Sequence, residues 1–138
     1  MFLGWDRYAL RRRGTAVPDD DTAAARWVLG QVGATIEASG NVWQVRGGSL
    51  HAPQAELYCG DSAATLRFLT AICAAIPGEC RLTAGASLVK RPVKQLLEAL
   101  RQLGVDCASA GDFPPVSIRG GEINGSTVSM PGNISSQF

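Results

Sequence analysis

The sequence predicts an α+β domain of repeated units, in which helices pack against small β-sheets. Apolar residues recur at helical spacing in three segments, and short alternating segments between them are typical of strands. The order of these elements repeats along the chain. Of its 138 residues, 46% are hydrophobic and 18% charged, which suits one domain with a buried core.

The first helix is expected to begin after Pro18. Aspartates at 19–21 supply N-cap candidates and negative charge for the helix start, and Gly33 is a candidate C-cap. Between them, apolar residues recur at helical spacing: Ala24, Trp27, Val28 and Val32. Two alternating segments, 35–37 and 42–45, flank a Ser-Gly-Asn turn and predict a hairpin.

A similar order follows in the second half. Residues 56–59 are a predicted strand, and a long apolar helix after them ends at Pro77-Gly78. Residues 80–83 form the next predicted strand. A third helix is predicted from Ser87, with Pro92 in its first turn and Gly104 at its end.

A second hairpin and a strand at 127–130 complete the repeat. Val-Arg-Gly-Gly at 45–48 matches Ile-Arg-Gly-Gly at 118–121, and the second hairpin is expected to be slightly longer. The period is too long for a simple solenoid, so it indicates duplicated α+β units.

Composition argues against several classes of function. The net charge of +1 disfavours nucleic acid and anionic membranes as partners, and the arginines at 11–13 are interpreted as a solvated tail. No segment is apolar enough to span a membrane or ordered like a signal peptide, so we expect a cytoplasmic protein. The four cysteines lack a C-x-x-C pair and the one histidine, His51, stands apart, so we expect reduced thiols and no metal site.

Three segments could bind an anion at a helix start. The first, 59–67, combines a glycine turn with Ser62 and Thr65, although Asp61 or Ser62 could be an N-cap and nothing more. The second, 87–93, holds Lys90 and Arg91, and Arg91 could bind a carboxylate through two hydrogen bonds unless both charges are simply solvated. The third, 131–138, offers two serines and Gln137, or again only an N-cap. No catalytic triad and no glycine-rich nucleotide loop is present.

Together these segments resemble the EPSP synthase family. Residues 60–67, Gly-Asp-Ser-Ala-Ala-Thr-Leu-Arg, are similar to its G-N-S-G-T-T-x-R turn, and Lys90-Arg91-Pro92-Val93 is similar to its R-P-M helix. Ser135-Ser136-Gln137 resembles its S-S-Q motif, and Asp20-Asp21-Thr22 its S-D-D-T segment. The resemblance runs from about Pro18 to Phe138.

The resemblance implies a function. The family transfers the enolpyruvyl group of phosphoenolpyruvate to the 5-hydroxyl of shikimate 3-phosphate, releases phosphate and needs no metal or organic cofactor. Ser135, Ser136 and Gln137 would bind shikimate 3-phosphate; Ala63, Arg91 and Gln137 would bind phosphoenolpyruvate. The implied fold is part of one of two domains built from βαβαββ units.

Three positions depart from the family motif. Ala63 stands where glycine is usual, and its methyl group would narrow the phosphoenolpyruvate side of the pocket. Some family members carry alanine there and tolerate the inhibitor glyphosate, so the resemblance implies tolerance in the parent enzyme. Asp61 replaces asparagine and adds negative charge, and Ala64 replaces a threonine.

The resemblance also leaves parts of the enzyme unaccounted for. Residues 1–17 lack the family's K-S-x-S-x-x-R anchor and form an N-terminal segment of uncertain role, while 18–138 is expected to be a partial domain of about two repeat units. We place no catalytic residue in this chain, because the acidic residues for proton transfer are expected in the second domain. The isolated chain is therefore expected to be inactive, with the remainder of the enzyme as a partner.

Other readings remain open at this point. One is a fragment of the sister family that transfers enolpyruvyl to UDP-N-acetylglucosamine, although S-S-Q and the T-L-R turn favour the shikimate enzyme. Another is a non-catalytic anion-binding or scaffold domain. A third is a fragment without function, whose exposed interface would favour association.

Overall fold

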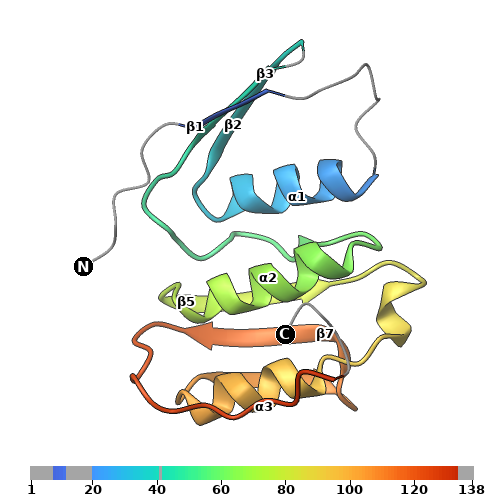
Figure 1. Ribbon diagram of the computed structural model, residues 1–138, viewed down its shortest axis with the longest axis vertical. Helices are drawn as coiled ribbons and strands as arrows, with labels where there is room; N and C mark the ends of the chain where they lie inside the picture. The colour runs from blue at the N-terminus through green and yellow to red at the C-terminus, as the bar shows by residue number, and fades with distance from the viewer. Residues whose placement is uncertain (1–7, 12–19, 41, 134–138) are drawn as a thin grey trace.

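The computed structural model describes residues 8–11, 20–40 and 42–133, with only the backbone described at 8–11 and 20. It contains a strand, a helix and a hairpin, followed by a longer α/β segment (Figure 1). The elements are β1 Tyr8–Arg11, α1 Asp20–Gln31, β2 Thr35–Ser39, β3 Val42–Arg46, β4 Leu57–Tyr58, α2 Ala63–Ala74, β5 Gly78–Thr83, the 3-10 helix η1 Leu88–Lys90, α3 Lys94–Gln102, β6 Asp106–Ala110 and β7 Phe113–Gly120.

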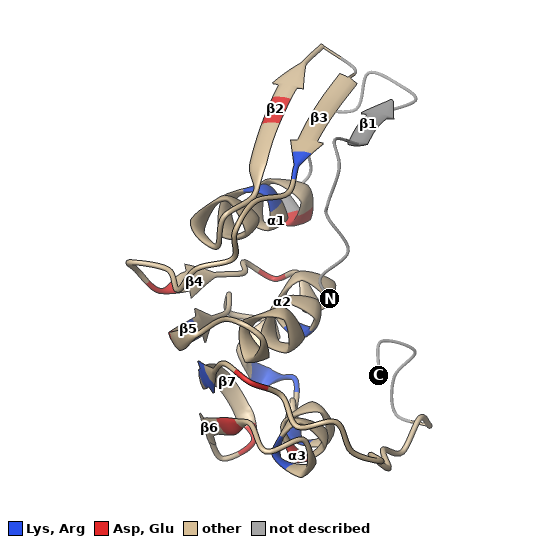
Figure 2. Ribbon diagram, turned by 90° about the vertical axis from the view of Figure 1, so that its left-hand side faces the viewer, with Lys and Arg blue, Asp and Glu red and all other residues tan. Residues whose placement is uncertain are grey.

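The strands form two sheets at opposite ends of the molecule (Figures 1 and 2). The first has the order β1-β3-β2 and is antiparallel throughout. The second has the order β4-β5-β7-β6, in which only β4 and β5 run parallel. The α+β class and both predicted hairpins are confirmed.

The internal repeat is visible in the topology. β1, α1, β2 and β3 follow one another as β5, α3, β6 and β7 do, and the two sets of strands share the spatial order first-third-second. With β4 and α2 in front, the second set forms a complete βαβαββ unit. β1 lies within the N-terminal segment to which the sequence assigned no role, and the predicted boundary between residues 17 and 18 stays a prediction.

One hydrophobic core joins the units. α2 contacts α1 on one side and α3 on the other, and it packs against β5 and β7. Each helix directs the apolar stripe that its spacing predicts into this core, as shown by Val28 and Val32 of α1, Leu66 and Cys73 of α2, and Leu97 of α3. Trp27 departs from that pattern, because it is 45% exposed.

The predicted helix from Ser87 is wrong in its first part. Residues 88–90 form a single 3-10 turn, Arg91 is extended with φ −96° and ψ 126°, and α3 begins only at Lys94. The ring of Pro92 disfavours a helical conformation in the residue before it, which breaks the helix there. Pro92 therefore precedes α3 instead of occupying its first turn, and Lys90 and Arg91 do not stand at the start of a long helix.

The predicted strand at 127–130 is also wrong, because these residues pair with no strand in the part of the chain that is described. The side chain of Gln102 instead forms two hydrogen bonds with the backbone of this segment. Its Oε1 accepts from the N–H of Ser129 and its Nε2 donates to the Ser129 carbonyl oxygen, each at 3.2 Å. A single side-chain contact satisfies one residue of the segment but cannot extend into a ladder.

Candidate anion-binding site

The turn between β4 and α2 builds the first part of the site. Gly60 has φ +58°, a conformation that favours glycine, and Ser62 is the N-cap of α2. The Oγ of Ser62 accepts from the backbone N–H of Thr65 at 3.3 Å and from its hydroxyl at 2.9 Å. Ser62 is buried, so its hydroxyl serves the helix and is not offered to a ligand.

Ala63 is the first residue of α2 and is half-buried. The first N–H groups of an α-helix have no partner within the helix, and they lie at the positive end of its dipole. The backbone of Ala63 and Ala64 therefore presents the kind of donor that phosphate and carboxylate groups accept from. The start of α2 at Ala63 agrees with the helix start expected in segment 59–67, and anion binding there stays a prediction.

A second loop lies beside this turn because β4 and β5 are parallel neighbours. The N–H of Cys59 donates to Thr83 O at 2.9 Å, and the N–H of Gly85 donates to Gly60 O at 2.7 Å. Both loops thus leave the same edge of the sheet, at the carboxyl ends of the strands, where open α/β sheets bind ligands.

Asp61 links the two loops directly. Its Oδ1 accepts from the backbone N–H groups of Ser87 and Leu88, each at 3.0 Å. The hydroxyl of Ser87 is the strongest of the contacts that lower the pKa of Asp61, and the charge of Arg91 adds to them. The carboxylate is therefore ionised at neutral pH.

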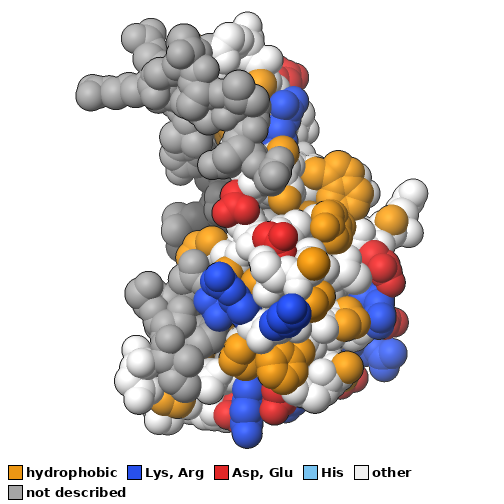
Figure 3. Space-filling model, turned by 90° about the vertical axis from the view of Figure 1, so that its right-hand side faces the viewer, with side chains coloured by type: hydrophobic (Ala, Val, Ile, Leu, Met, Phe, Trp, Pro, Cys, Tyr) orange, Lys and Arg blue, Asp and Glu red, His pale blue; other side chains and the backbone are white. Residues whose placement is uncertain are grey.

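Two arginines, Arg67 and Arg91, lie close enough near this edge for their charges to interact. Burial lowers the pKa of Arg67, and the nearby charge of Arg91 lowers it further. Arg67 comes from α2 and Arg91 from the extended residue after η1, so two elements contribute one cationic pair. Charged side chains of both signs neighbour each other on the face shown in Figure 3.

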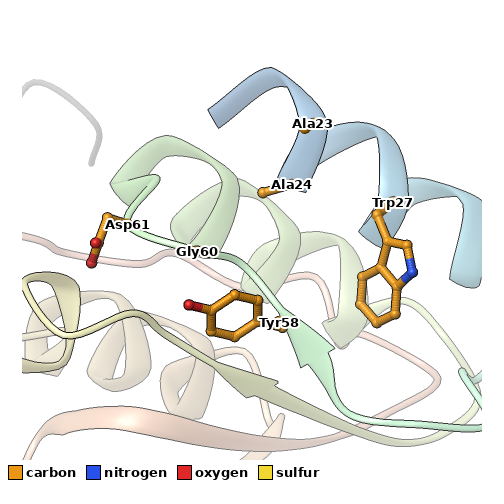
Figure 4. Close-up of a pocket in the computed structure, with 6 residues that line it drawn as sticks. All are labelled: Ala23, Ala24, Trp27, Tyr58, Gly60 and Asp61. Atoms are coloured by element: carbon orange, nitrogen blue, oxygen red, sulfur yellow. The ribbon is translucent and has the colours of Figure 1, made fainter. Parts of the chain in front are cut away.

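A hollow of about 520 Å³ lies on the α1 side of the turn. Figure 4 shows Trp27 and Tyr58 on its wall, with Asp61 at the opposite end from Trp27. Its remaining lining residues are Ala23, Ala24 and Gly60. The hollow is open and mostly apolar, and the arginine pair does not line it.

The structure tests only part of the sequence expectations for the site. The charge of Arg91 acts on Asp61 and Arg67, which stand on either side of Ala63 along the chain, whereas Ser135, Ser136 and Gln137 lie outside the described residues. Within the described ranges, no group of three or more histidine, cysteine or acidic side chains could hold a metal ion, and no helix is long and apolar enough to cross a membrane. His51 is exposed, with Nδ1 3.2 Å from Ala52 O.

Sequence reasoning named Arg67 only as a member of a motif, and Asp61 only as an N-cap candidate and an added negative charge. Helical spacing could have indicated Arg67, since it follows the N-cap by five residues and so stands one turn beyond the helix start. The contact of Asp61 is to backbone groups 26 and 27 residues later, which no side-chain pattern encodes.

The fold defines a class: a repeat-built α+β protein in which two loops with charged side chains are joined at the carboxyl edge of a parallel strand pair. The family model for EPSP synthase (3-phosphoshikimate 1-carboxyvinyltransferase) matches residues 16–138. The chain therefore belongs to the EPSP synthase family. This match favours the shikimate enzyme over the sister family that acts on UDP-N-acetylglucosamine.

Individual relatives agree with the family match. A 3-phosphoshikimate 1-carboxyvinyltransferase of Dehalococcoides mccartyi is 49% identical over 121 residues, which are 86% of this chain and 28% of the relative. One of Methanococcus maripaludis is 41% identical over 77% of this chain and 25% of the relative. EPSP synthase from Acinetobacter baumannii superposes with a TM-score of 0.82 at 26% identity, covering 94% of this chain and 30% of that one. The chain thus spans about 28% of the length of the first of these relatives.

Proposed function

We propose that this chain forms part of an enzyme that transfers the enolpyruvyl group of phosphoenolpyruvate to the 5-hydroxyl of shikimate 3-phosphate, releasing phosphate. Family membership supports the reaction. The observation that supports the role of this chain is that Asp61 joins the turn before α2 to the loop that carries Arg91, whose charge acts on both Asp61 and Arg67.

Phosphoenolpyruvate is the substrate assigned to this edge. Its carboxylate and phosphate groups carry the charge that a guanidinium fork and free helix N–H groups recognise. Arg91, the backbone of Ala63 and Gln137 would bind it, and the proximity of Arg67 to Arg91 adds a second cation. Ser135, Ser136 and Gln137 would bind shikimate 3-phosphate.

The chain alone is proposed to bind without catalysis. Proton transfer needs acidic groups close to the reacting carbon, and we assign none in this chain to that role. In the whole enzyme, the remaining residues would close over the two substrates and exclude water, which strengthens the electrostatic contacts inside. We propose the cytoplasm as its location, since all four cysteines are buried and unpaired, as suits a reducing compartment.

Titration of isotope-labelled chain tests this proposal. Phosphoenolpyruvate should shift the amide signals of Ala63 and Ala64 saturably, and shikimate 3-phosphate should shift those of Ser135, Ser136 and Gln137. Arg91→Gln should weaken the phosphoenolpyruvate response about tenfold or more, because it removes a charge-assisted fork. Arg119→Gln is the matched control, since Arg119 is exposed at the far end of β7, 4.0 Å from Asp106. Equal responses of the two variants would contradict the assignment of Arg91.

A further inference from the structure

We propose that Asp61 is a positioning residue, whose carboxylate fixes the loop that carries Arg91 against the start of α2. The part of this inference that concerns ligand affinity rests on the proposed function. The part that concerns the loop rests on the hydrogen bonds alone.

Asp61 forms specific hydrogen bonds with the loop that follows β5. One oxygen, Oδ1, accepts from two consecutive backbone N–H groups, those of Ser87 and Leu88, at 3.0 Å each. These groups stand at the first turn of η1, where backbone donors have no helical partner. Arg91 follows Lys90, the last residue of η1, so fixing the start of this short turn limits where the guanidinium can reach.

Gly85 makes room for the carboxylate. A Cβ at this position would lie 2.6 Å from Oδ1 of Asp61, too close for any side chain without displacing the carboxylate. The N–H of Gly85 donates to Gly60 O at 2.7 Å, and the N–H of Val89 donates to Gly85 O at 3.0 Å. The two loops are therefore joined by backbone at 60 and 85 and by side chain at 61, which together restrict rotation of one loop against the other.

Charge alone makes the opposite prediction from positioning. Asp61 is near enough to Arg91 for the guanidinium to favour its ionised form, and Arg91 in turn disfavours the charge on Arg67. If Asp61 acted only as a negative charge beside an anion site, its removal would strengthen the binding of phosphoenolpyruvate. If it positions Arg91, its removal weakens that binding. The sign of the change separates the two roles.

Two variants, Asp61→Asn and Asp61→Ala, should weaken the binding of phosphoenolpyruvate to different degrees. The amide oxygen of asparagine can still accept from both N–H groups, but its NH₂ group adds a donor beside Arg91. Alanine removes every contact. Positioning therefore predicts the affinity order unaltered chain, Asp61→Asn, Asp61→Ala, with the last about tenfold weaker. Asp106→Asn is the control for an equal change in net charge, because Asp106 lies on β6 with only an exposed 4.0 Å pair to Arg119.

The experiment combines phosphoenolpyruvate titration with amide hydrogen exchange on the 138-residue chain and these three variants. We expect the predicted affinity order, faster exchange at Ser87 and Leu88 in Asp61→Ala, and Asp106→Asn behaving like the unaltered chain. Equal or tighter binding by both Asp61 variants overturns the positioning role. If the unaltered chain does not bind phosphoenolpyruvate, the proposed function of this edge fails, and exchange alone decides the loop: unchanged exchange at Ser87 and Leu88 overturns the inference. If Asp61→Ala does not fold, the same two readouts on Asp61→Asn decide.

Discussion

At the scale of single residues, the methyl group of Ala63 is expected to influence which ligands fit at the start of α2. Ala63 opens α2 and is half-buried, next to the N–H groups that we assign to phosphoenolpyruvate. A pocket discriminates between ligands that differ by one methylene by about 10-fold or more, and a methyl group on the wall acts in the same way. The side chain therefore bears on which small anions fit.

In the enzyme that we propose contains this chain, replacing Ala63 by glycine should increase the sensitivity to glyphosate about tenfold. If Ala63 lines the proposed phosphoenolpyruvate pocket, its methyl group narrows the side that the inhibitor would share, and its removal restores the space. Inhibition constants with phosphoenolpyruvate as the competing substrate measure the effect. Ala71→Gly, on the exposed face of α2, controls for the general cost of glycine in a helix. Equal inhibition of the parent and the Ala63→Gly variant would contradict a role of Ala63 in glyphosate tolerance.

The four cysteines should be unreactive in the folded chain. All are buried, and burial raises the pKa of Cys59 from 9.0 to about 12. A hydrogen bond from Cys73 lowers the pKa of Cys80, so burial is what protects that thiol. Because only the thiolate reacts, a thiol reagent at pH 8 should modify them about as slowly as the chain unfolds. Since the folded pKa of Cys59 lies above the unfolded value, its contribution to stability is complete below pH 9 and is lost as the pH rises towards 12. Rapid labelling of Cys59 in native buffer, detected by mass spectrometry, would contradict the predicted slow modification of the thiols.

Part of the site was predictable from single residues. The N-cap expected at Asp61 or Ser62 and the glycines expected at the ends of helices, Gly33 and Gly104, follow from local chemistry, and the structure confirms Ser62 and both glycines. The linkage through Asp61 was not predictable, because its partners are backbone N–H groups brought near by the pairing of β4 with β5. Such pairing is a property of the sheet and leaves no mark on the local sequence.

At the scale of elements, periodicity predicted each helix but not where the third begins. The stripe of α3 is correct, with Leu97 and Leu100 buried, yet Pro92 separates it from η1. Proline disfavours the helical conformation in the residue before it, and this local steric effect outweighs a continuous apolar pattern. The strand expected at 127–130 follows from the repeat alone, which cannot tell whether a neighbouring strand exists to pair with it.

The contact between β7 and the end of α2 requires glycine at position 120. A Cβ there would collide with the carbonyl oxygens of Cys73 and Ile76, which are backbone atoms and cannot swing away. Gly120→Ala should therefore lower the free energy of unfolding by about 2–4 kcal/mol, since strand and helix must separate. Urea denaturation followed by circular dichroism measures this. Gly125→Ala, where a Cβ would meet nothing within 4 Å, should change stability by less than about 1 kcal/mol; a similar loss in both variants would argue against the packing explanation.

At the scale of the whole molecule, α2 is more apolar than a surface helix needs to be. Leu66, Leu69 and Cys73 are buried, yet the opposite face carries Phe68, which is 57% exposed, and Ala71. A helix that is hydrophobic all round is usually covered on every side. Because the chain spans only about 28% of the length of its relative from Dehalococcoides mccartyi, other residues of the full-length protein are the cover we expect.

The isolated chain should therefore self-associate through this face of α2. An exposed aromatic side chain among small apolar ones favours burial against a second copy when its natural cover is absent. Sedimentation velocity over a range of concentrations should show a concentration-dependent increase in mass. Phe68→Asp should abolish the increase without lowering the midpoint of urea unfolding, because its side chain is mostly exposed. Phe113→Asp serves as the control, since Phe113 is also exposed, at 39%, but lies on β7. If the control abolished association while Phe68→Asp did not, the covered face would be that of the second sheet and not of α2.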